Sequence, residues 1–314
     1  MSHKHRVVSI VAKEEEAGKT VAQMLKRRLG ISESILRCIR VANAGTMLDG
    51  SFCRTDAVVQ AGQVVSINLT QCCPQTSIEP QAGPIDISYE DEDLLVIDKP
   101  VGIVVHPSRG HRGGTLCNYV SHYLSEKGEH PVPHPVNRLD RETSGLVVFA
   151  KHAHAQNRLA EDLHTKRFER HYLAICEGDA PDSGTIDAPI ARIADVYGSF
   201  GVREDGKRAV THFKTLAHFT HEGEGNRLSL VQLALETGRT HQIRVHMSHI
   251  GHPLLGDTAY GQASALIERP ALHSWKLSLA HPVTQQAVRL ESPLPQDMAR
   301  LIELQADVSA ADPE

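Results

Sequence analysis

The sequence lacks any run of about 18 apolar residues, the length that a membrane-spanning helix requires. Its first 19 residues, MSHKHRVVSIVAKEEEAGK, also lack the long apolar core and the small-residue cleavage site of a secretion signal. We therefore expect a soluble protein of the cytoplasm with no membrane partner. Hydrophobic residues make up 40% of the 314 positions, which is enough to form a packed core.

Cysteine is sparse and shows no metal-binding pattern. No two cysteines have CxxC spacing, and the only neighbours, Cys72 and Cys73, are adjacent, so that they cannot easily chelate one zinc ion. We expect reduced, structural thiols. The six cysteines are Cys38, Cys53, Cys72, Cys73, Cys117 and Cys176.

Several motifs of familiar enzyme classes are also missing. The chain has no GxxxxGK[ST], no strand followed by GxGxxG, no GxSxG and no HExxH, which argues against nucleotide-triphosphate, dinucleotide, serine-hydrolase and zinc-protease sites. The best metal candidate is the run HQIRVHMSHIGH, in which His246 and His249 lie one turn apart and His241 and His252 flank them. It includes no carboxylate and no second cluster, so we predict no metal and interpret these residues as surface and core histidines.

The charge is acidic overall but unevenly distributed. A net charge of −5 argues against nonspecific coating of nucleic acid. Between residues 19 and 40, however, six basic residues face the single acid Glu33, which predicts a local basic surface that contacts a polyanion. A solvated helix face is the alternative. The residues that we expect to contact the polyanion are Lys26, Arg27, Arg28 and Arg37.

The pattern of the chain predicts two folded parts. Residues 1–70 contain a helix pair broken at Gly30, followed by short strands separated by glycines, and residues 71–84 form a proline-containing linker. Residues 85–300 mix strands and helices without a regular βαβ repeat, which favours an α+β domain. Residues 301–314 are expected to be a C-terminal tail. Within the larger part, we expect a hairpin near residues 85–107 and a helix with Ala155, Leu159 and Leu163 on one face.

The stretch HPVNRLDRETSGLVVFAK, residues 134–151, places Asp140 between Arg138 and Arg141 before a strand-like apolar run. A surface ion pair is one interpretation. The other is a carboxylate held rigidly on a turn at the edge of a cleft, where a neighbouring arginine would lower its pKa and keep it ionised for attack on a carbon centre. Position and rigidity therefore make Asp140 a candidate nucleophile.

Several further stretches give the chain a resemblance to a known family. They include EDEDLLVIDKPVGIVVHP, NRLDRETSGLVVFAK, ERHYLAICEG, GKRAVTHFKTL, ETGRTHQIRVHMSHIGHPLLGDTAYG and ALHSWKLSLAHPVT, and together they cover nearly all of residues 85–295. In their order and spacing they resemble the RluA-type pseudouridine synthases. The resemblance implies a mixed, mostly antiparallel sheet split by a catalytic cleft. It also implies an enzyme that isomerises uridine in RNA without cofactor or metal, with Asp140 as nucleophile.

The resemblance further implies roles for other residues of these motifs. Tyr172 would pack on the uracil and help to deprotonate its ring carbon, and Arg244 would pair with Asp140 and fix its orientation. Arg138 would fill space or contact phosphate when the target nucleotide is flipped out. Asn137 stands where the family most often has histidine, so that its contact with RNA is less certain. The remaining residues expected to contact substrate or RNA are Arg239 and His241.

The N-terminal part resembles, more loosely, the small S4-like RNA-binding domain that is often fused to these synthases. On this resemblance large-subunit ribosomal RNA is the expected target, and transfer RNA is the alternative within the same family. A nucleoside-bond hydrolase is a rival because a carboxylate at an anomeric carbon serves both reactions, although a hydrolase normally needs a second catalytic carboxylate. A noncatalytic RNA-binding factor is a third possibility. We expect a monomer.

Overall fold

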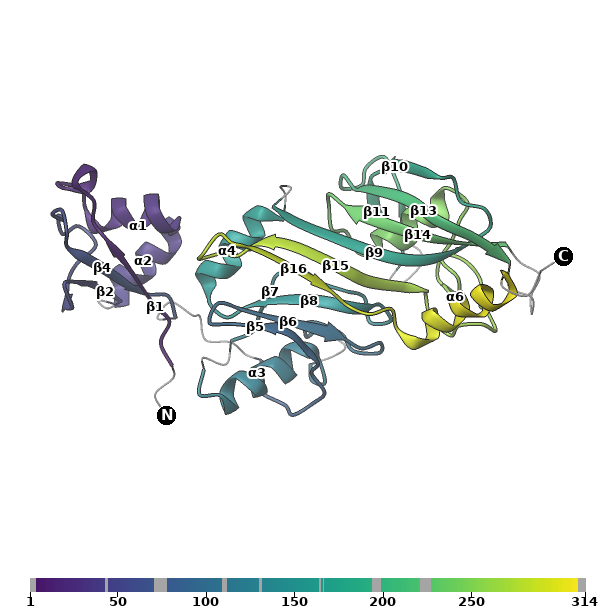
Figure 1. Cartoon of the computed structure of the whole chain (residues 1–314), viewed down its shortest axis with the longest axis horizontal. Coiled ribbons are helices and arrows are strands. Elements are labelled where there is room, and N and C mark those ends of the chain that lie inside the picture. The colour runs from purple at the N-terminus through teal and green to yellow at the C-terminus, as the bar shows by residue number, and fades with distance from the viewer. Residues whose placement is uncertain are drawn as a thin grey trace.

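The computed structural model describes residues 4–42, 45–70, 78–108, 112–129, 132–163, 165, 167–193, 199–220 and 227–309. The described chain forms an elongated molecule with a small N-terminal unit at one end and a larger part that contains the principal sheet (Figure 1). Each of the two has its own buried hydrophobic cluster. No helix in these ranges combines the length and the apolar character needed to cross a membrane.

The N-terminal unit is a four-stranded antiparallel sheet packed against two helices. Val65 and Ile67 point from the sheet into the core, where they meet Met24 and Leu36 of the helices. Gly30 ends the first helix in the left-handed conformation (φ 66°), which glycine adopts without a steric penalty. The expected helix pair and short strands are confirmed, whereas strand β1 was not predicted. The elements are β1 (Val7–Val11), η1 (Glu14–Glu16), α1 (Val21–Leu29), α2 (Glu33–Ala42), β2 (Thr46–Leu48), β3 (Ser51–Phe52) and β4 (Val64–Asn68).

The larger part is built on a ten-stranded sheet with the path β10-β13-β14-β9-β15-β8-β6-β5, from which β16 and β7 branch. Only the β15–β8 pair is parallel among the pairs of this sheet, so the mixed, mostly antiparallel α+β fold that was predicted is confirmed. The strands of the sheet are β5 (Ile87–Glu90), β6 (Leu94–Lys99), β7 (His134–Pro135), β8 (Ser144–Ala150), β9 (Phe168–Glu177), β10 (Ser183–Asp187), β13 (Val210–Thr220), β14 (Arg227–Leu235), β15 (Leu272–Ala280) and β16 (Ala287–Glu291).

Helices and one further strand pair surround this sheet. The expected hairpin is β5–β6, and the expected helix is α4, on which Ala155 and Leu159 are fully buried. Helix α3 was not predicted. The elements outside the sheet are α3 (Leu116–Glu126), α4 (Ala153–Asp162), β11 (Ile190–Arg192), β12 (Phe200–Val202), α5 (Gln242–His249) and α6 (Gln296–Ser309).

The sheet divides where β8 meets β15, and this point positions the candidate site. The two strands share only two residue pairs, His273 with Ser144 and Ser274 with Gly145. Gly145 has a φ of 107°, and a Cβ added to it would lie 2.2 Å from the carbonyl oxygen of Ser274. Only glycine therefore lets β8 pass this close to β15. The crossing places the residues just before β8, including Asp140, beside the centre of the sheet.

One expectation about chain organisation is changed by the structure. The tail expected from residue 301 is instead part of α6, which continues to Ser309 and buries Met298 and Leu301 against the sheet. Half of the predicted linker, residues 71–77, lies outside the described residues, and so do Cys72 and Cys73. The four other cysteines are free thiols.

A buried ion pair joins the N-terminal unit to the larger part. Arg6 donates two hydrogen bonds to Asp93, at 2.8 and 2.9 Å, and the Asp93 side chain is only 3% exposed. Asp93 is also hydrogen-bonded to the fully buried His152 at 2.8 Å. On the other side of the junction, Asn157 of α4 donates to Ser32. The two parts are thus connected by specific polar contacts as well as by the chain.

Candidate active site

A cleft of about 280 Å³ lies where the sheet divides. One wall is formed by residues 136–143, which lead into β8, and the other by residues 235–244, which run from the end of β14 into α5. Tyr172 and Arg170 of β9 line it as well. The cleft therefore brings together side chains from three segments that are far apart in the sequence, among them Asp140, Tyr172 and Arg244.

Asp140 reaches into this cleft from the turn before β8. Its side chain is 27% exposed, and its Oδ2 atom lies 3.5 Å from Nη1 of Arg244 and 3.9 Å from Nε2 of His241. The turn is closed by a hydrogen bond from the backbone amide of Thr143 to the Asp140 carbonyl. The carboxylate is therefore accessible to a ligand, faces a cation and sits on a constrained backbone, as the sequence predicted.

Lys99, which was not predicted as a site residue, stabilises the turn that carries Asp140. It is fully buried, and its Nζ donates to the carbonyl oxygens of Pro100 at 2.8 Å and Arg141 at 3.1 Å. Burial lowers the pKa of Lys99 to about 8, although the nearby carboxylates of Glu142 and Asp140 oppose that shift. Lys99 thus ties the end of β6 to the residue that follows Asp140. Its position in the stretch VIDKPVG, which belongs to the family resemblance, was the only feature of the sequence that could have indicated a role for it.

Arg244 is held mainly by a second acid, Asp257. Its Nε and Nη2 atoms donate to the two carboxylate oxygens of Asp257, both at 2.7 Å, and the Asp257 side chain is completely buried. The guanidinium also lies over the ring of Tyr260, 5.0 Å from its centroid. Burial would lower the pKa of Arg244, but the bonds to Asp257 outweigh it and raise the pKa.

The contact of Arg244 with Asp140 therefore uses the one terminal nitrogen that Asp257 leaves free. The pairing of Arg244 with Asp140 was predicted from the sequence, and the structure places the two groups together. Asp257 and Tyr260 were not predicted. Both belong to the stretch GDTAYG, which was quoted for the resemblance without a role being given to its residues.

Tyr172 lies in the middle of β9 and is 4% exposed. Burial raises the pKa of its hydroxyl, and the charge of Asp140 acts in the same direction. The phenol therefore stays protonated at neutral pH. A buried, neutral aromatic ring beside the carboxylate is suited to pack against a planar base.

His241 is the N-cap residue directly before α5 and has a left-handed backbone (φ 55°), and its Nδ1 is hydrogen-bonded to the hydroxyl of Tyr260 at 2.8 Å. Burial lowers its pKa, although the charge of Asp140 opposes this. His246, the central member of the histidine run considered for metal binding, uses both ring nitrogens in hydrogen bonds, to Thr211 and to the carbonyl of Ala188. The histidine run thus contributes one residue to the cleft, and its central member serves the packing of α5.

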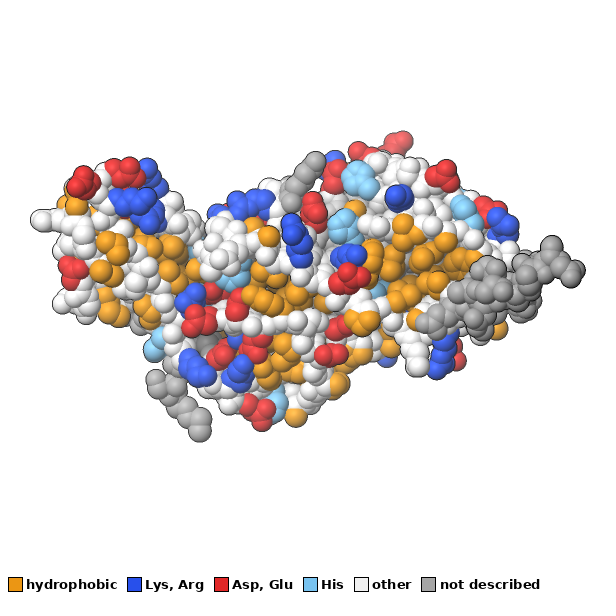
Figure 2. All heavy atoms as spheres, viewed as in Figure 1, with side chains coloured by type: hydrophobic (Ala, Val, Ile, Leu, Met, Phe, Trp, Pro, Cys, Tyr) orange, Lys and Arg blue, Asp and Glu red, His pale blue; other side chains and the backbone are white. Residues whose placement is uncertain are grey.

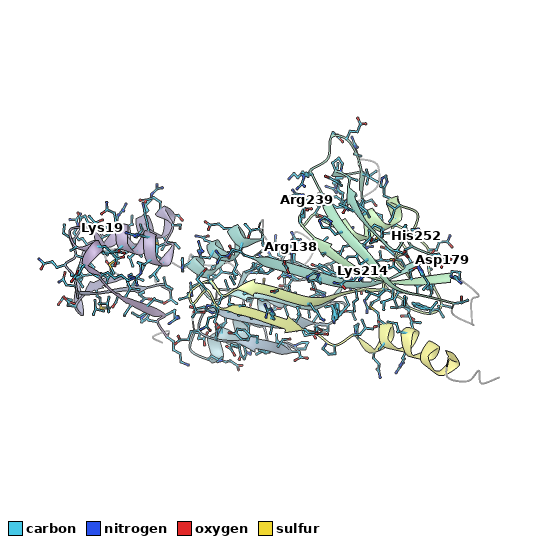
Figure 3. All side chains as sticks on the ribbon, turned by 45° about the horizontal axis from the view of Figure 1, so that its top comes forward. Lys19, Arg138, Asp179, Lys214, Arg239 and His252 are labelled. Atoms are coloured by element: carbon cyan, nitrogen blue, oxygen red, sulfur yellow. The ribbon has the colours of Figure 1, made fainter. Side chains whose placement is uncertain are left out.

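The remaining predicted residues of the cleft differ in exposure. Arg138 and Arg239 are exposed at the cleft and lie in the larger part of the molecule, away from Lys19 on the N-terminal unit (Figure 3). Asn137 is buried, and its side chain bonds the backbone of β8 at Leu146 and Val148. The expected contact of Asn137 with RNA is therefore replaced by a structural role, because both polar groups of its amide are already used.

The basic residues of the N-terminal unit are largely paired within the unit itself. Lys26 forms an ion pair with Glu33, Arg27 with Glu15 at 3.6 Å, and Arg28 with the buried Glu16 at 3.1 Å. Figure 2 shows blue and red side chains adjoining one another on the N-terminal unit. The acids of residues 14–16 precede the basic stretch of residues 19–40 in the sequence. In the folded unit, Glu15 and Glu16 lie against α1 and pair with its arginines. Arg37 is exposed and makes no ion pair with any residue of the described ranges.

Comparison with known proteins agrees with this geometry. The family model described as RNA pseudouridylate synthase matches residues 93–249. The chain is 38% identical over 302 residues to the uncharacterized RNA pseudouridine synthase YhcT of Bacillus subtilis, an alignment that covers 96% of this chain and 98% of the relative. It is 40% identical over 273 residues to ribosomal large subunit pseudouridine synthase D of Escherichia coli K12, with 82% of each protein covered.

A solved human structure, RNA pseudouridylate synthase domain containing 1, superposes with a TM-score of 0.53 and 25% identity over 77% of this chain and 100% of that one. The matched segment 93–249 contains Asp140, Tyr172 and Arg244, the three residues that meet in the cleft. The chain belongs to the RNA pseudouridylate synthase family and is an RNA pseudouridine synthase.

Proposed function

We propose that this enzyme converts specific uridines of large-subunit ribosomal RNA to pseudouridine, with Asp140 as the nucleophile. The observation that carries the proposal is the arrangement of three groups in one cleft. Asp140 is partly exposed and 3.5 Å from Arg244, Asp257 locks the orientation of Arg244, and Tyr172 lines the same cleft. An ionised carboxylate, a fixed cation and a neutral ring match the sugar and the base of one nucleotide.

The reaction needs the uracil to leave the ribose and to return through a different atom. Asp140 attacks the ribose or assists formation of a glycal, the bond to the base nitrogen breaks, and the uracil turns before a carbon–carbon bond forms. Arg244, 3.5 Å from Asp140, keeps the carboxylate oriented. We assign Tyr172, which lines the cleft, to packing on the uracil.

A nucleotide reaches such a cleft only after it has been flipped out of its stack, which costs least in loops and bulges of structured RNA. Arg138 and Arg239, both exposed at the cleft, are positioned to bind the phosphates on either side. The volume of about 280 Å³ is close to the lower end of the ~300–1,000 Å³ that is typical of small-ligand sites. One extruded nucleotide is a suitable occupant.

The choice of large-subunit ribosomal RNA follows the name of the Escherichia coli relative, and transfer RNA is the alternative substrate. We assign RNA binding to the N-terminal unit, the cytoplasm as the location and a monomer as the working form. A hydrolase would need a second carboxylate free to activate water. Besides Asp140 the cleft lining includes Glu236, which is bonded to His212 and Arg208 at the protein surface.

The test is a map of pseudouridine across all cellular RNAs in a strain that lacks the gene, complemented with the wild-type chain or with Asp140→Asn. We expect the wild type alone to restore modification, at sites in large-subunit ribosomal RNA. Restoration by Asp140→Asn would contradict the nucleophile, and restored sites confined to transfer RNA would contradict the substrate. Release of free uracil from RNA by the purified enzyme would instead support hydrolysis. A phenotype fully rescued by Asp140→Ala would indicate a noncatalytic role.

A further inference from the structure

Arg170 is a buried cation that the mechanism above does not use. It lies on β9 two residues before Tyr172, and because side chains alternate along a strand, the two point to the same face of the sheet. Arg170 is 7% exposed and lines the cleft. Its Nε is buried without a hydrogen-bond partner, and its guanidinium makes no ion pair within the described part of the chain.

The surroundings of Arg170 differ from those of Arg244. Arg244 has the carboxylate of Asp257 against it, whereas the wall opposite Arg170 is Gly238, at which an added Cβ would lie 3.2 Å from Nη1. Gly238 leaves that space open, so that a planar group can approach the guanidinium. Asp140 lines the same cleft, but its carboxylate faces Arg244 and His241.

A buried charge without a counter-charge is costly to the folded protein, and such groups persist where a ligand or a reaction step compensates them. The compensating group must carry negative charge and reach the depth of Tyr172. The phosphates of a flipped nucleotide stay on the strand, where the exposed Arg138 and Arg239 stand. The uracil enters more deeply and becomes negatively charged during the reaction.

We propose that Arg170 stabilises the negative charge that develops on the uracil when its bond to the ribose breaks. This rests on the proposed placement of the nucleotide. The electron pair of the broken C1′–N1 bond goes to the uracil, where it spreads over N1 and the two carbonyl oxygens, and the guanidinium donates to one of these oxygens. When C5 bonds to C1′, the electron pair of the bond to Asp140 returns to the carboxylate and the base becomes neutral. The C5 proton then leaves to solvent, and N1 takes up a proton to give pseudouridine. A donor preorganised in a site with little water binds the charged state more strongly than the neutral one, which accelerates the cleavage step.

The test compares Arg170→Gln, Arg170→Lys and the wild type in single-turnover reactions, with enzyme in saturating excess. The substrates are large-subunit ribosomal RNA transcripts made with uridine or with 5-fluorouridine. Conversion of the original nucleoside is followed by liquid chromatography of the digested RNA coupled to mass spectrometry, because uridine and pseudouridine have the same mass. We expect Arg170→Gln to lose about 10²–10³ in rate on uridine, the usual effect of removing one such donor. The loss should be about tenfold smaller on 5-fluorouridine, because fluorine stabilises the departing anion and so reduces the need for the cation.

Arg170→Lys should retain an intermediate rate because it keeps the charge. Arg227→Gln is the matched control: it removes one positive charge from the neighbouring strand β14, at a surface site where Arg227 pairs with Asp179, and its rate should not change. The melting temperature of Arg170→Gln should equal or exceed that of the wild type, because an unpaired buried charge is lost.

Three results would overturn the inference. Weaker RNA binding with an unchanged saturating rate would make Arg170 a phosphate contact. Equal losses on the two nucleosides would show that no charge on the base is stabilised. A lowered melting temperature that accompanies both losses would make the residue a structural support. If the wild type itself modified neither transcript, the proposed substrate would fail and Arg170 would be tested on the RNA that the cellular map identifies.

Discussion

The pairing of Arg244 with Asp257 can be tested by Asp257→Asn. The carboxylate is completely buried and accepts two hydrogen bonds of 2.7 Å from the guanidinium, and its Oδ1 also accepts from the backbone amides of Ala259 and Tyr260. Asparagine keeps one oxygen of the same shape but turns an N–H group toward the arginine. The substitution therefore replaces one acceptor by a donor and leaves Arg244 with an excess of buried charge.

The magnitude follows from burial. Removing one partner of a buried ion pair typically costs ~3–5 kcal/mol in the free energy of unfolding. Arg244 can turn partly toward Asp140, which lies only 3.5 Å away, so we expect about 3 kcal/mol. That movement of Arg244 also changes the orientation of the Asp140 carboxylate in the cleft. We expect the single-turnover rate to fall about 10- to 100-fold, which corresponds to a rise of ~1.4–2.7 kcal/mol in the activation barrier.

The assay pairs urea unfolding followed by circular dichroism with single-turnover conversion of RNA at a temperature where the variant is folded. Asp297→Asn is the control. Asp297 also binds an arginine through two hydrogen bonds, from Nε and Nη2 of Arg269 at 2.7 and 2.8 Å, but it lies on α6 outside the cleft. Nη1 of Arg269 keeps its own acceptors, the carbonyl oxygens of Glu142, Pro270 and Leu272, so the arginine stays in place.

Asp297 is 41% exposed, so Asp297→Asn should cost only ~1 kcal/mol and leave the rate unchanged. If Asp257→Asn kept the wild-type rate as well, Asp257 would not be what orients Arg244, and the proposed role of this pair would be refuted.

Three further variants test other parts of the structure. Gly145→Ala should destabilise the protein by at least ~3 kcal/mol in urea unfolding, because a Cβ would collide with Ser274 at a φ of 107°; normal stability would contradict the described crossing of β8 and β15. Glu90, although partly buried, accepts hydrogen bonds from Lys127, Lys151 and Tyr123 that lower its pKa from 4.5 to about 2. Its contribution to stability is therefore complete above pH 4.5 and lost as the pH falls toward 2, so the stability difference between wild type and Glu90→Gln should shrink over that interval, and a difference independent of pH would refute this. Arg37→Gln should reduce the slope of log K against log salt for RNA binding by ~0.7–0.9, whereas Arg28→Gln, already paired with Glu16, should change it less; equal effects would mean that internal pairing does not decide which residue binds phosphate.

Local patterns predicted the elements whose period is clear. The helix pair around Gly30, the β5–β6 hairpin and α4 follow from apolar spacing and turn residues, and the structure contains all of them. Strand β1 was missed because three of its five residues are exposed and its pairing partner, β4, comes more than 50 residues later. Contacts that close over such distances leave little trace in a local pattern.

The same distinction holds within the cleft. Asp140, Tyr172 and Arg244 could be named because a family resemblance assigned roles to those positions. Asp257 orients Arg244, and Lys99 bonds the backbone at Arg141. These partners are recognised only in the folded structure. Arg170 was missed for another reason. An arginine in an alternating strand is ordinarily a surface residue, and only the coordinates show that it is buried and unpaired.

If the N-terminal unit binds RNA as proposed, the bond between Arg6 and Asp93 also restricts which nucleotides of that RNA can reach the cleft. Because that carboxylate is buried and shared with His152, the N-terminal unit cannot swing freely about the chain that connects it. An RNA bound to the N-terminal unit can then place in the cleft only those nucleotides that lie at a fixed distance from its contact with the unit. The enzyme would then distinguish uridines of identical local sequence by their distance from a neighbouring helix of the RNA.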